Sequence, residues 1–364
     1  MNHPRFAPDA LEGYARGIAS AMGAPAEVAG EVARHLVRSN LAGQDSHGVL
    51  RLPQYAGQAD RGELVATGVP RILAETPATV LIDAQRGFGH YAAHTAVELV
   101  AGKARATGIG AAAIRHSTHI GRMGEYTERC EALGLVLIAT VGMAGPGVGG
   151  VVPFGGRERF FGANVWSIGV PGGSTPMVFD ASMSSIAVGK VYVAKAAGRE
   201  LPPGCVVDRE GAPATHPDAF LEGGAALPMG GDVAGHKGFG LGLAAALLGG
   251  LAMIGDTSPT LAGAPAAAGS TATGRMAGAF LIAIDPEAFG GVLAYRALVD
   301  ECLHALRAVQ PAPGVEAVTV PGERSRATRL ERMTSGIPLA PATCDELAKL
   351  GQRFGVAMAS SLGS

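Results

Sequence analysis

The sequence has few charged residues, few aromatic residues and few cysteines. Charged side chains make up 16% of the 364 residues and aromatic side chains 5%, and the formal net charge is −2. Both signs of charge are mixed along the chain, so the pattern disfavours nucleic acid and anionic membranes as partners. The cysteines are far apart and form no CxxC pair, which favours reduced thiols in a cytoplasmic protein over a disulfide framework or a zinc ribbon. They are Cys130, Cys205, Cys302 and Cys344.

Signals for secretion or membrane insertion are also scarce. The N-terminal sequence, MNHPRFAPDALEG, has no apolar stretch of the kind that a signal peptide needs, so we expect no secretory leader. Two uncharged runs, 133–156 and 238–255, contain many glycines. We interpret them as a buried strand with its loop and as a buried helix. The 55 glycines are roughly twice the average usage and predict many tight turns and close backbone approaches.

Hydrophobic periodicity divides the chain into helical and mixed parts. Residues 8–42 predict two helices, separated near Pro25 and ended by Gly43. An α/β alternation follows from residue 78, and the tail from residue 293 returns to helical patterns. The predicted strands are 78–84, 109–115, 135–141, 165–170, 177–180 and 279–284. The predicted helices of the core and tail are 91–106, 120–133, 185–197, 239–254 and 344–354, and 202–235 is expected to be rich in loops.

We therefore predict an α/β fold with a helical part at each end of the chain. The N-terminal part is residues 1–77, and it is expected to pack with the C-terminal return, residues 293–364. Residues 78–292 form the α/β core between them. Two polar segments and two turns rich in glycine or hydroxyl residues lie between these predicted elements. The functional predictions rest on them.

The first polar segment reads Asp45-Ser46-His47-Gly48-Val49-Leu50-Arg51 and is followed by Tyr55. A helix that begins early places His47, Arg51 and Tyr55 on one face, whereas a helix that begins at Pro53 leaves His47 and Arg51 on its entry loop. A guanidinium beside an imidazole can hold a carboxylate while a proton moves at the neighbouring carbon. Plainer interpretations are a surface ion pair for Arg51, a helix cap for Ser46 and half-buried packing for Tyr55.

The second polar segment, Ser117-Thr118-His119-Ile120-Gly121, follows the predicted strand 109–115. Ligand crevices of open α/β sheets lie at such strand ends. A histidine there, with a reference pKa near 6.5, is suited to proton transfer near neutrality. The alternative is a histidine at a helix start that bonds a backbone group.

Two further turns precede predicted helices. Asp180-Ala181-Ser182-Met183-Ser184-Ser185 places small hydroxyls at a helix start, and 230–238 places glycines with His236 and Lys237 at another. Both suit the oxygens of a phosphate or ribose. A simple helix cap and a flexible loop with a solvated lysine are the alternatives.

Two other patterns are weaker than they look. Residues 87–92 match G-x-G-x-x-A between a strand and a helix, but the acidic residue about 20 positions later is missing, so close helix–strand packing explains the glycines better. The pairs His90/His94 and His116/His119 lack the glutamate of an HExxH motif and any nearby Cys or Asp cluster. We therefore predict no metal site.

Several segments in register resemble the malate/L-lactate dehydrogenase family of the second type, whose members are 2-hydroxyacid reductases without a Rossmann fold. The resemblance runs nearly from end to end. It implies a non-Rossmann, mixed-sheet cofactor-binding core, and an enzyme that uses NAD or NADP to interconvert 2-keto acids and L-2-hydroxy acids. It also implies a homodimer. The segments that carry it are 40–48 with Arg51 and Tyr55, 116–124, 180–190, 202–205, 236–238 and 321–324.

The resemblance also implies roles for individual residues. His119 would be the acid/base at the carbonyl oxygen and Arg51 would hold the carboxylate, with Ser46 and Tyr55 nearby. Met183 replaces a hydroxyl residue of the family's usual turn, which leaves the preference between NAD and NADP open. The residues expected to face the cofactor are His47, Gly121, Arg122, Met123, Asp180, Ser182, Ser184, His236 and Lys237.

Other activities fit part of this pattern. Within the same fold, the enzyme could reduce a cyclic imine acid of the piperideine-2-carboxylate type or oxidise ureidoglycolate. From another class, a metal-dependent lyase or hydrolase would use His116 and His119. A protein that binds the cofactor without catalysis is the remaining alternative.

Overall fold

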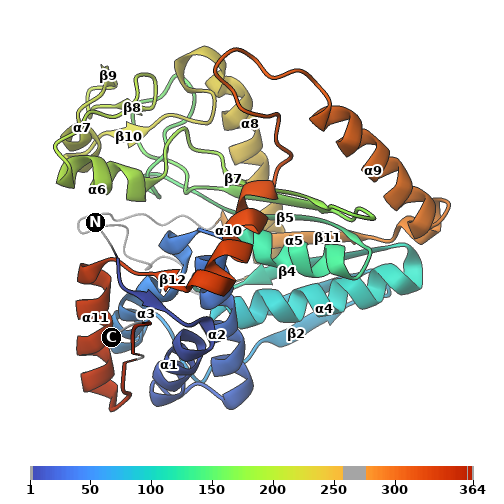
Figure 1. Cartoon of the computed structure of the whole chain (residues 1–364), viewed down its shortest axis with the longest axis horizontal. Coiled ribbons are helices and arrows are strands. Elements are labelled where there is room, and N and C mark those ends of the chain that lie inside the picture. Colours follow the sequence, from blue (N-terminus) through green and yellow to red (C-terminus); the bar gives the residue numbers. More distant parts are fainter. Residues whose placement is uncertain (1–2, 257–275, 359, 363–364) are drawn as a thin grey trace.

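The computed structural model describes residues 3–256, 276–358 and 360–362, and a seven-stranded mixed sheet lies at its centre (Figure 1). The strand order is β2-β3-β4-β11-β5-β6-β7. β3 and β4 run parallel, and every other neighbouring pair is antiparallel. The predicted non-Rossmann, mixed-sheet core is confirmed. The strands are β2 (Arg71–Glu75), β3 (Thr79–Asp83), β4 (Ile109–Arg115), β5 (Val136–Ala144), β6 (Val165–Val170), β7 (Met177–Ser182) and β11 (Met276–Ile284).

Helices cover both faces of this sheet. α4 (Gly89–Thr107) and α5 (Met123–Ala132) lie on one face, and α8 (Gly231–Gly250) lies on the other (Figure 1). The alternation of β5 explains the division, because Leu137 and Ala139 join the core on the α4–α5 side while Gly142 meets the backbone of α8. All six strands predicted for this core are present, and only the exposed edge strand β2 was missed.

Helix α8 departs from its prediction in two ways. It begins at Gly231 rather than at residue 239, so His236 and Lys237 lie within the helix and not on a loop before it. It is also buried on one face only, because Leu241, Leu247 and Ile254 beyond its end remain 43%, 53% and 72% exposed. Among the described residues, 231–253 is the one stretch that is long and apolar enough to cross a membrane, although a core helix passes the same test.

The N-terminal helices form a second core with the end of the chain. Residues Leu11, Ile18, Val32 and Leu36 recur at helical spacing and are fully buried against Leu347. β1 (Arg5–Phe6) pairs antiparallel with β12 (Ile337–Pro338), which ties the two ends together. The predicted helices within 8–42 and 344–354 are confirmed. The helices of this core are α1 (Pro8–Ala21), α2 (Ala26–Leu41), α3 (Leu52–Asp60) and α11 (Pro341–Phe354).

The remaining elements form a small lobe and a C-terminal connection. α9 (Val292–Arg307) contacts the loop before β7, where Asp300 accepts from the backbone N–H groups of Gly173 and Ser174. α10 (Glu323–Ser335) instead reaches the N-terminal helices. The small lobe contains α6 (Val188–Ala196), β8 (Val206–Val207), β9 (Pro213–Ala214), α7 (Pro217–Leu221) and β10 (Ala225–Ala226). These short elements agree with the loop-rich prediction for 202–235.

Candidate active site

Two short 3-10 turns carry the first polar segment. Asp45–His47 and Val49–Arg51 form these turns, and α3 begins only at Leu52, so His47 and Arg51 lie ahead of the helix. Asn40 at the end of α2 holds both turns: its amide nitrogen donates to Asp45 Oδ1 at 2.7 Å, and its amide oxygen accepts from the N–H of Val49 at 2.9 Å. A Cβ at position 48 would overlap the Asn40 amide, which explains the glycine there.

Arg332 of α10 fastens the same loop from the other end of the sequence. Its guanidinium donates to both oxygens of Asp45, at 2.7 and 3.0 Å, and also to the carbonyl oxygen of Asn40. The side chain of Arg332 is only 12% exposed. Because the fork of a guanidinium matches a carboxylate, this contact fixes the position of the loop as well as its charge. No motif in the sequence connected residue 332 with the first polar segment.

Arg51 lies on this loop with part of its guanidinium already engaged. Nε donates to the carbonyl oxygen of Ser46 at 2.6 Å, and Nη1 donates to Gln54 at 2.5 Å. A guanidinium has five N–H groups, so these two contacts orient the side chain and leave others for a ligand. The Ser46 hydroxyl contacts His47 Nδ1 at 2.9 Å, so it does not cap α3.

His119 lies in the loop between β4 and α5, as the sequence predicted, and meets the first segment there. Its Nδ1 lies 2.8 Å from the hydroxyl of Tyr55, and its ring stacks on that of His47 with centroids 5.4 Å apart. Tyr55 is fully buried. The structure therefore brings Ser46, His47, Arg51, Tyr55 and His119 into one site, although 64 residues separate Tyr55 from His119 along the chain.

Two further histidines that sequence analysis had not placed here line the inner wall of this site. His90 at the start of α4 contacts the Tyr55 hydroxyl through Nε2 at 3.2 Å, and His35 of α2 packs edge-on against His90 with ring centroids 4.8 Å apart. Both are completely buried. Gly121 has a φ of +76°, and a Cβ there would overlap His35 and His90, so glycine makes room for both rings. We call His35, His47, Tyr55, His90 and His119 the imidazole cluster.

Burial keeps the imidazole cluster uncharged. It lowers the pKa of His119 well below its ordinary value, and His90, Arg51 and His47 lower it further. Burial, followed by the charges of Arg51 and Arg122, lowers the pKa of His47 to about 4. Burial raises the pKa of Tyr55 above its ordinary value. At neutral pH the site therefore holds neutral imidazoles and a protonated phenol beside the positive charge of Arg51, with Arg122 close behind.

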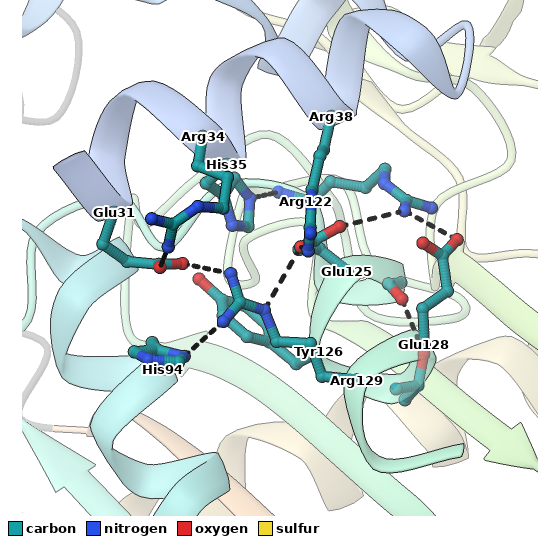
Figure 2. Close-up of polar contacts among 12 residues, drawn as sticks. Glu31, Arg34, His35, Arg38, His94, Arg122, Glu125, Tyr126, Glu128 and Arg129 are labelled. Carbon is teal, nitrogen blue, oxygen red and sulfur yellow. Dashed lines mark hydrogen bonds and ion pairs between the residues drawn. The ribbon is translucent and has the colours of Figure 1, made fainter. Parts of the chain in front are cut away.

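A second buried cluster lies between α2 and α5 and is ionic (Figure 2). Glu125 accepts from Arg38 at 2.7 Å and from Arg129 at 3.2 Å, while Arg129 also pairs with Glu31. The carboxylates of Glu31 and Glu125 are 2% and 1% exposed. We call the whole set the ionic network. Its members are Glu31, Arg34, Arg38, Arg122, Glu125, Glu128, Arg129 and Arg329.

Arg122 belongs to both settings. Its backbone N–H donates to His35 Nε2 at 2.9 Å, whereas its guanidinium lies 2.7 Å from Glu128 and 3.8 Å from Glu125 (Figure 2). Asp180 accepts from the N–H of Gly124 at 2.7 Å, so it holds the first turn of α5. Met123 is buried in the core beneath the sheet. These three residues, which were expected to face a cofactor, make contacts that position α5.

A cleft of about 570 Å³ opens between the β7–α6 turn and the start of α8. Ser182 and Ser184 line it with Lys190, Gly231 and Asp232, although the Ser184 hydroxyl already donates to the carbonyl oxygen of Ile186 at 2.7 Å. An ammonium, a hydroxyl and the first N–H groups of a 20-residue helix suit phosphate oxygens, and a carboxylate suits ribose hydroxyls. This donor set fits a dinucleotide. His236 and Lys237 lie about one turn farther along α8, outside the lining of the cleft.

The patterns set aside in the sequence have structural explanations. A Cβ at Gly87 would overlap the backbone of Gly68, and one at Gly89 would overlap that of Thr118, so the glycines allow close backbone packing, but against loops rather than against a strand as predicted. His116 is held between Asp83 at 2.9 Å and Asp256 at 3.0 Å. Across 3–256, 276–358 and 360–362, no group of three or more His, Cys, Asp or Glu side chains is arranged to hold a metal ion.

Comparisons with known proteins match nearly the whole chain to one family. The family model described as malate/L-lactate dehydrogenase matches residues 6–348. Hydroxycarboxylate dehydrogenase B from Escherichia coli strain K12 is 35% identical over 356 residues, which are 95% of this chain and 94% of the relative. A Delta(1)-pyrroline-2-carboxylate/Delta(1)-piperideine-2-carboxylate reductase from Pseudomonas syringae pv. tomato is 34% identical, with 90% and 91% covered. The solved structure of sulfolactate dehydrogenase from Methanocaldococcus jannaschii has a TM-score of 0.86 at 30% identity, with 97% and 98% covered.

Proposed function

The chain belongs to the malate/L-lactate dehydrogenase family, and from that premise we propose that it interconverts a 2-keto acid and the corresponding L-2-hydroxy acid with NAD or NADP. One observation carries the proposal: His119 contacts Tyr55 and His47 of the distant first polar segment, and Arg51 of that segment lies near enough for its charge to lower the pKa of His119. A cation for the carboxylate then stands beside an imidazole for the carbonyl oxygen. Family membership also replaces the interpretation as a metal-dependent lyase or hydrolase.

Arg51 binds the substrate carboxylate in this proposal. Its contacts with Ser46 and Gln54 orient the guanidinium before a ligand arrives, which reduces the entropy lost on binding. Fixing the carboxylate fixes the adjacent carbonyl, and this determines which face of the keto carbon is attacked. A single enantiomer of the product follows from that constraint.

His119 moves the proton. Nδ1 is engaged by Tyr55, so Nε2 gives its proton to the carbonyl oxygen during reduction and takes it from the hydroxyl during oxidation. In the free protein the low pKa keeps His119 neutral, with burial and then His90, Arg51 and His47 as the causes. A bound carboxylate offsets the charge of Arg51 and favours the imidazolium, so binding of a keto acid is accompanied by uptake of a proton.

The cleft beside α8 would hold the cofactor. Ser182, Lys190 and the first turn of α8 would bind its phosphates, and Asp232 would bind a ribose. When bound, the nicotinamide cofactor supplies or accepts the hydride. Asp232 disfavours a second phosphate on that ribose while Lys190 favours one, so NAD and NADP are both retained in the proposal.

A cyclic imine acid is the second candidate substrate. The observation that favours it is the similarity to the Pseudomonas syringae reductase, whose name covers pyrroline- and piperideine-2-carboxylates. Such a substrate carries its carboxylate on the carbon of the C=N bond, so Arg51 would serve the same purpose as for a keto acid. The imine nitrogen binds its proton more tightly than a carbonyl oxygen, so it needs less help from His119.

We also propose that the enzyme is a homodimer. The outer faces of α8 and α9 support this, because large apolar side chains there remain open to solvent. They include Leu241 at 43%, Leu247 at 53%, Leu293 at 77% and Leu298 at 63% exposed. Light scattering after size exclusion should give twice the chain mass of 36.6 kDa, and a monomer at micromolar concentration would contradict the proposal.

A substrate and cofactor panel tests the proposed function. The purified protein is mixed with NADH or NADPH and with pyruvate, oxaloacetate, hydroxypyruvate or piperideine-2-carboxylate, and the nicotinamide absorbance is followed. We expect turnover with at least one 2-keto acid and none with acetone, which lacks the carboxylate. Turnover of the imine acid alone would select the second candidate. A protein that binds the reduced cofactor yet turns over no acid on the panel would be a binding protein, and the proposal would fail.

A further inference from the structure

The hydroxyl of Tyr55 lies between two imidazoles in the floor of the site. His119 Nδ1 is 2.8 Å from it on one side, and His90 Nε2 is 3.2 Å from it on the other. Tyr55 and His90 are both fully buried. Their rings meet edge to face, with centroids 5.4 Å apart, so the phenol is held against the histidine behind it. Water therefore does not compete for this hydroxyl.

A hydroxyl has one proton, so Tyr55 can donate to only one of the two imidazoles. If it donates to His119, then His119 Nδ1 is an acceptor and the proton of the neutral ring lies on Nε2. If it donates to His90, its oxygen is free to accept from His119 Nδ1–H. These two orders give His119 opposite tautomers.

Only the second order allows His119 to act as an acid and a base at Nε2. With a proton on Nδ1, the neutral ring presents a bare Nε2 that accepts the proton of a hydroxy acid. The imidazolium that forms then has Nε2–H ready for a keto acid, and its Nδ1–H still requires an acceptor. That acceptor is the Tyr55 oxygen, and it is available only when the Tyr55 hydroxyl donates its hydrogen bond to another group. Among the described residues, His90 Nε2 is the other group within hydrogen-bond distance of it.

We propose that His90 is a positioning residue for His119. By accepting a hydrogen bond from the Tyr55 hydroxyl at Nε2, His90 holds His119 in the Nδ1–H tautomer and stabilises its imidazolium form. This role rests on the proposed function, because it assigns proton transfer to His119. His90 itself does not touch the substrate. The Tyr55 hydroxyl transmits its effect and keeps its own proton throughout.

The surroundings of His90 agree with a neutral acceptor. Burial lowers the pKa of His90 to about 3, and His47 and Arg51 lower it further, so its ring carries one proton at neutral pH. Nδ1 has no partner among the described residues, so no contact at that nitrogen opposes placing the proton there. The charged or titratable groups around His119 are Arg51 and His47 on the 45–51 turns, Tyr55 on α3, His90 on α4 and, behind it, His35 on α2.

Two substitutions separate acceptance of the proton from simple space filling. His90→Leu fills much of the volume but cannot accept, whereas His90→Gln offers an amide oxygen near the position of Nε2. The reduction needs protonated His119, so kcat/KM falls as pH rises through its pKa in the working enzyme. In His90→Leu we expect this alkaline limb to move down by about one pH unit, with kcat about tenfold lower at pH 7 and KM within about twofold. His90→Gln should restore both the limb and kcat.

His94→Gln serves as the matched control, because it lies one turn later on α4 and contacts Arg129 rather than Tyr55. Its pH profile should coincide with that of the unsubstituted protein. If His90→Leu and His90→Gln lose activity equally and in step with their stability, with the limb unmoved, His90 is only structural and the inference is overturned.

The ring nitrogens of His119 give a readout that needs no turnover. In ¹⁵N-histidine-labelled protein at pH 8, with the signal assigned by its loss in His119→Gln, we expect Nδ1 protonated and Nε2 bare. His90→Leu should reverse this. A wild-type spectrum with the proton on Nε2 overturns the inference, even if His90→Leu does not fold. Absence of any dehydrogenase activity would defeat the proposed function instead, while the spectrum still decides the tautomer.

Discussion

Helix α2 contributes side chains to two buried polar clusters that treat charge in opposite ways. His35 enters the imidazole cluster, in which burial lowers the pKa of each histidine and removes its charge. Glu31 and Arg38 enter the ionic network, in which carboxylates and guanidinium groups remain side by side (Figure 2). The two clusters lie on either side of Arg122, whose N–H serves one and whose guanidinium serves the other.

The difference follows from the partners rather than from burial alone. Burial raises the pKa of Glu128, but Arg122 and Arg329 bring it below its ordinary value. Burial raises the pKa of Glu31 more than Arg129 and Arg34 lower it, so even this network only partly offsets desolvation. The histidines have no carboxylate within their cluster, so they are neutral instead of being paired as cations. A site that lacks a compensating anion is suited to bind one, and the substrate carboxylate is the anion that we propose.

The largest expected effect comes from replacing His119, the proposed acid/base of the imidazole cluster. His119→Gln should lower kcat by about two to four decades, because proton transfer to the carbonyl oxygen is lost. Steady-state kinetics with the best acid from the panel measures it. His216→Gln is the control, since that ring is 64% exposed and far along the chain in the small lobe. Near-normal turnover of His119→Gln would remove His119 from the mechanism.

The ionic network should respond in stability. Glu125→Gln leaves the largely buried Arg129 and the partly exposed Arg38 without their shared carboxylate, and it should cost about 3–5 kcal/mol of unfolding free energy. Asp60→Asn breaks an ion pair with Arg353 in which both side chains are about half exposed, and it should cost much less stability than Glu125→Gln. Urea denaturation measures both. Equal losses in the two variants would mean that burial does not distinguish these pairs.

Acid should weaken the fold mainly through the histidines. His90 has a pKa of about 3 in the folded protein and an ordinary value of 6.5. Its neutral form therefore contributes stability that is complete above pH 6.5 and is lost as the pH falls from 6.5 toward 3. The unfolding free energy should therefore fall by up to about 1.4 kcal/mol per pH unit for such a group below pH 6.5. Glu31, with its raised pKa, acts in the opposite direction.

Urea midpoints between pH 7 and pH 5 test this dependence. The urea midpoint should fall on acidification. In His90→Gln the midpoint should depend less on pH, by about the contribution of one histidine. A midpoint that stays constant down to pH 5 would show that the buried histidines are charged in the folded protein, and the contrast between the two clusters would disappear.

The smallest effect is expected at the contact between the 3-10 turns of residues 45–51 and α10. Arg332→Lys keeps the charge but loses the two-pronged contact with Asp45, so the loop that carries Arg51 should be held less firmly. We expect KM for the keto acid to rise about tenfold, with kcat changed less. Arg324→Lys on the same helix is exposed and should have no effect. An unchanged KM in Arg332→Lys would mean that Asn40 alone positions the loop.

Local patterns predicted the regular elements well. β6 spans the predicted residues 165–170, and the apolar run before Gly142 forms β5 as expected. Period-two and period-3.6 patterns record which face of an element is buried, and burial is the main force on a strand or helix. The start of α8 was missed because glycine is a poor helix former, yet Gly231 and Gly238 pack against other backbone and Gly235 packs against the Phe154 ring.

The site was predicted in part. His119, Arg51, His47 and Tyr55 were singled out because each lies near other polar groups in the sequence, and the structure brings them together. His35, Arg332 and the role of His90 were not found, because each lies in a segment where nothing nearby reveals its partner. Whether Ser182, Lys190 and the other cleft residues bind a cofactor stays a prediction.

The sequence by itself determined the family, the α/β class and the residues proposed to carry the chemistry, since these depend on residue types and short spacings. Only the tertiary structure decided which protons those residues hold. His119 becomes a neutral, orientable imidazole because Tyr55, His90 and the buried wall from α2 surround it. The proton affinity of a side chain depends on its desolvation and on charges a few ångströms away. The segments that carry His35, Tyr55, His90 and His119 come within such distances of one another only in the folded protein.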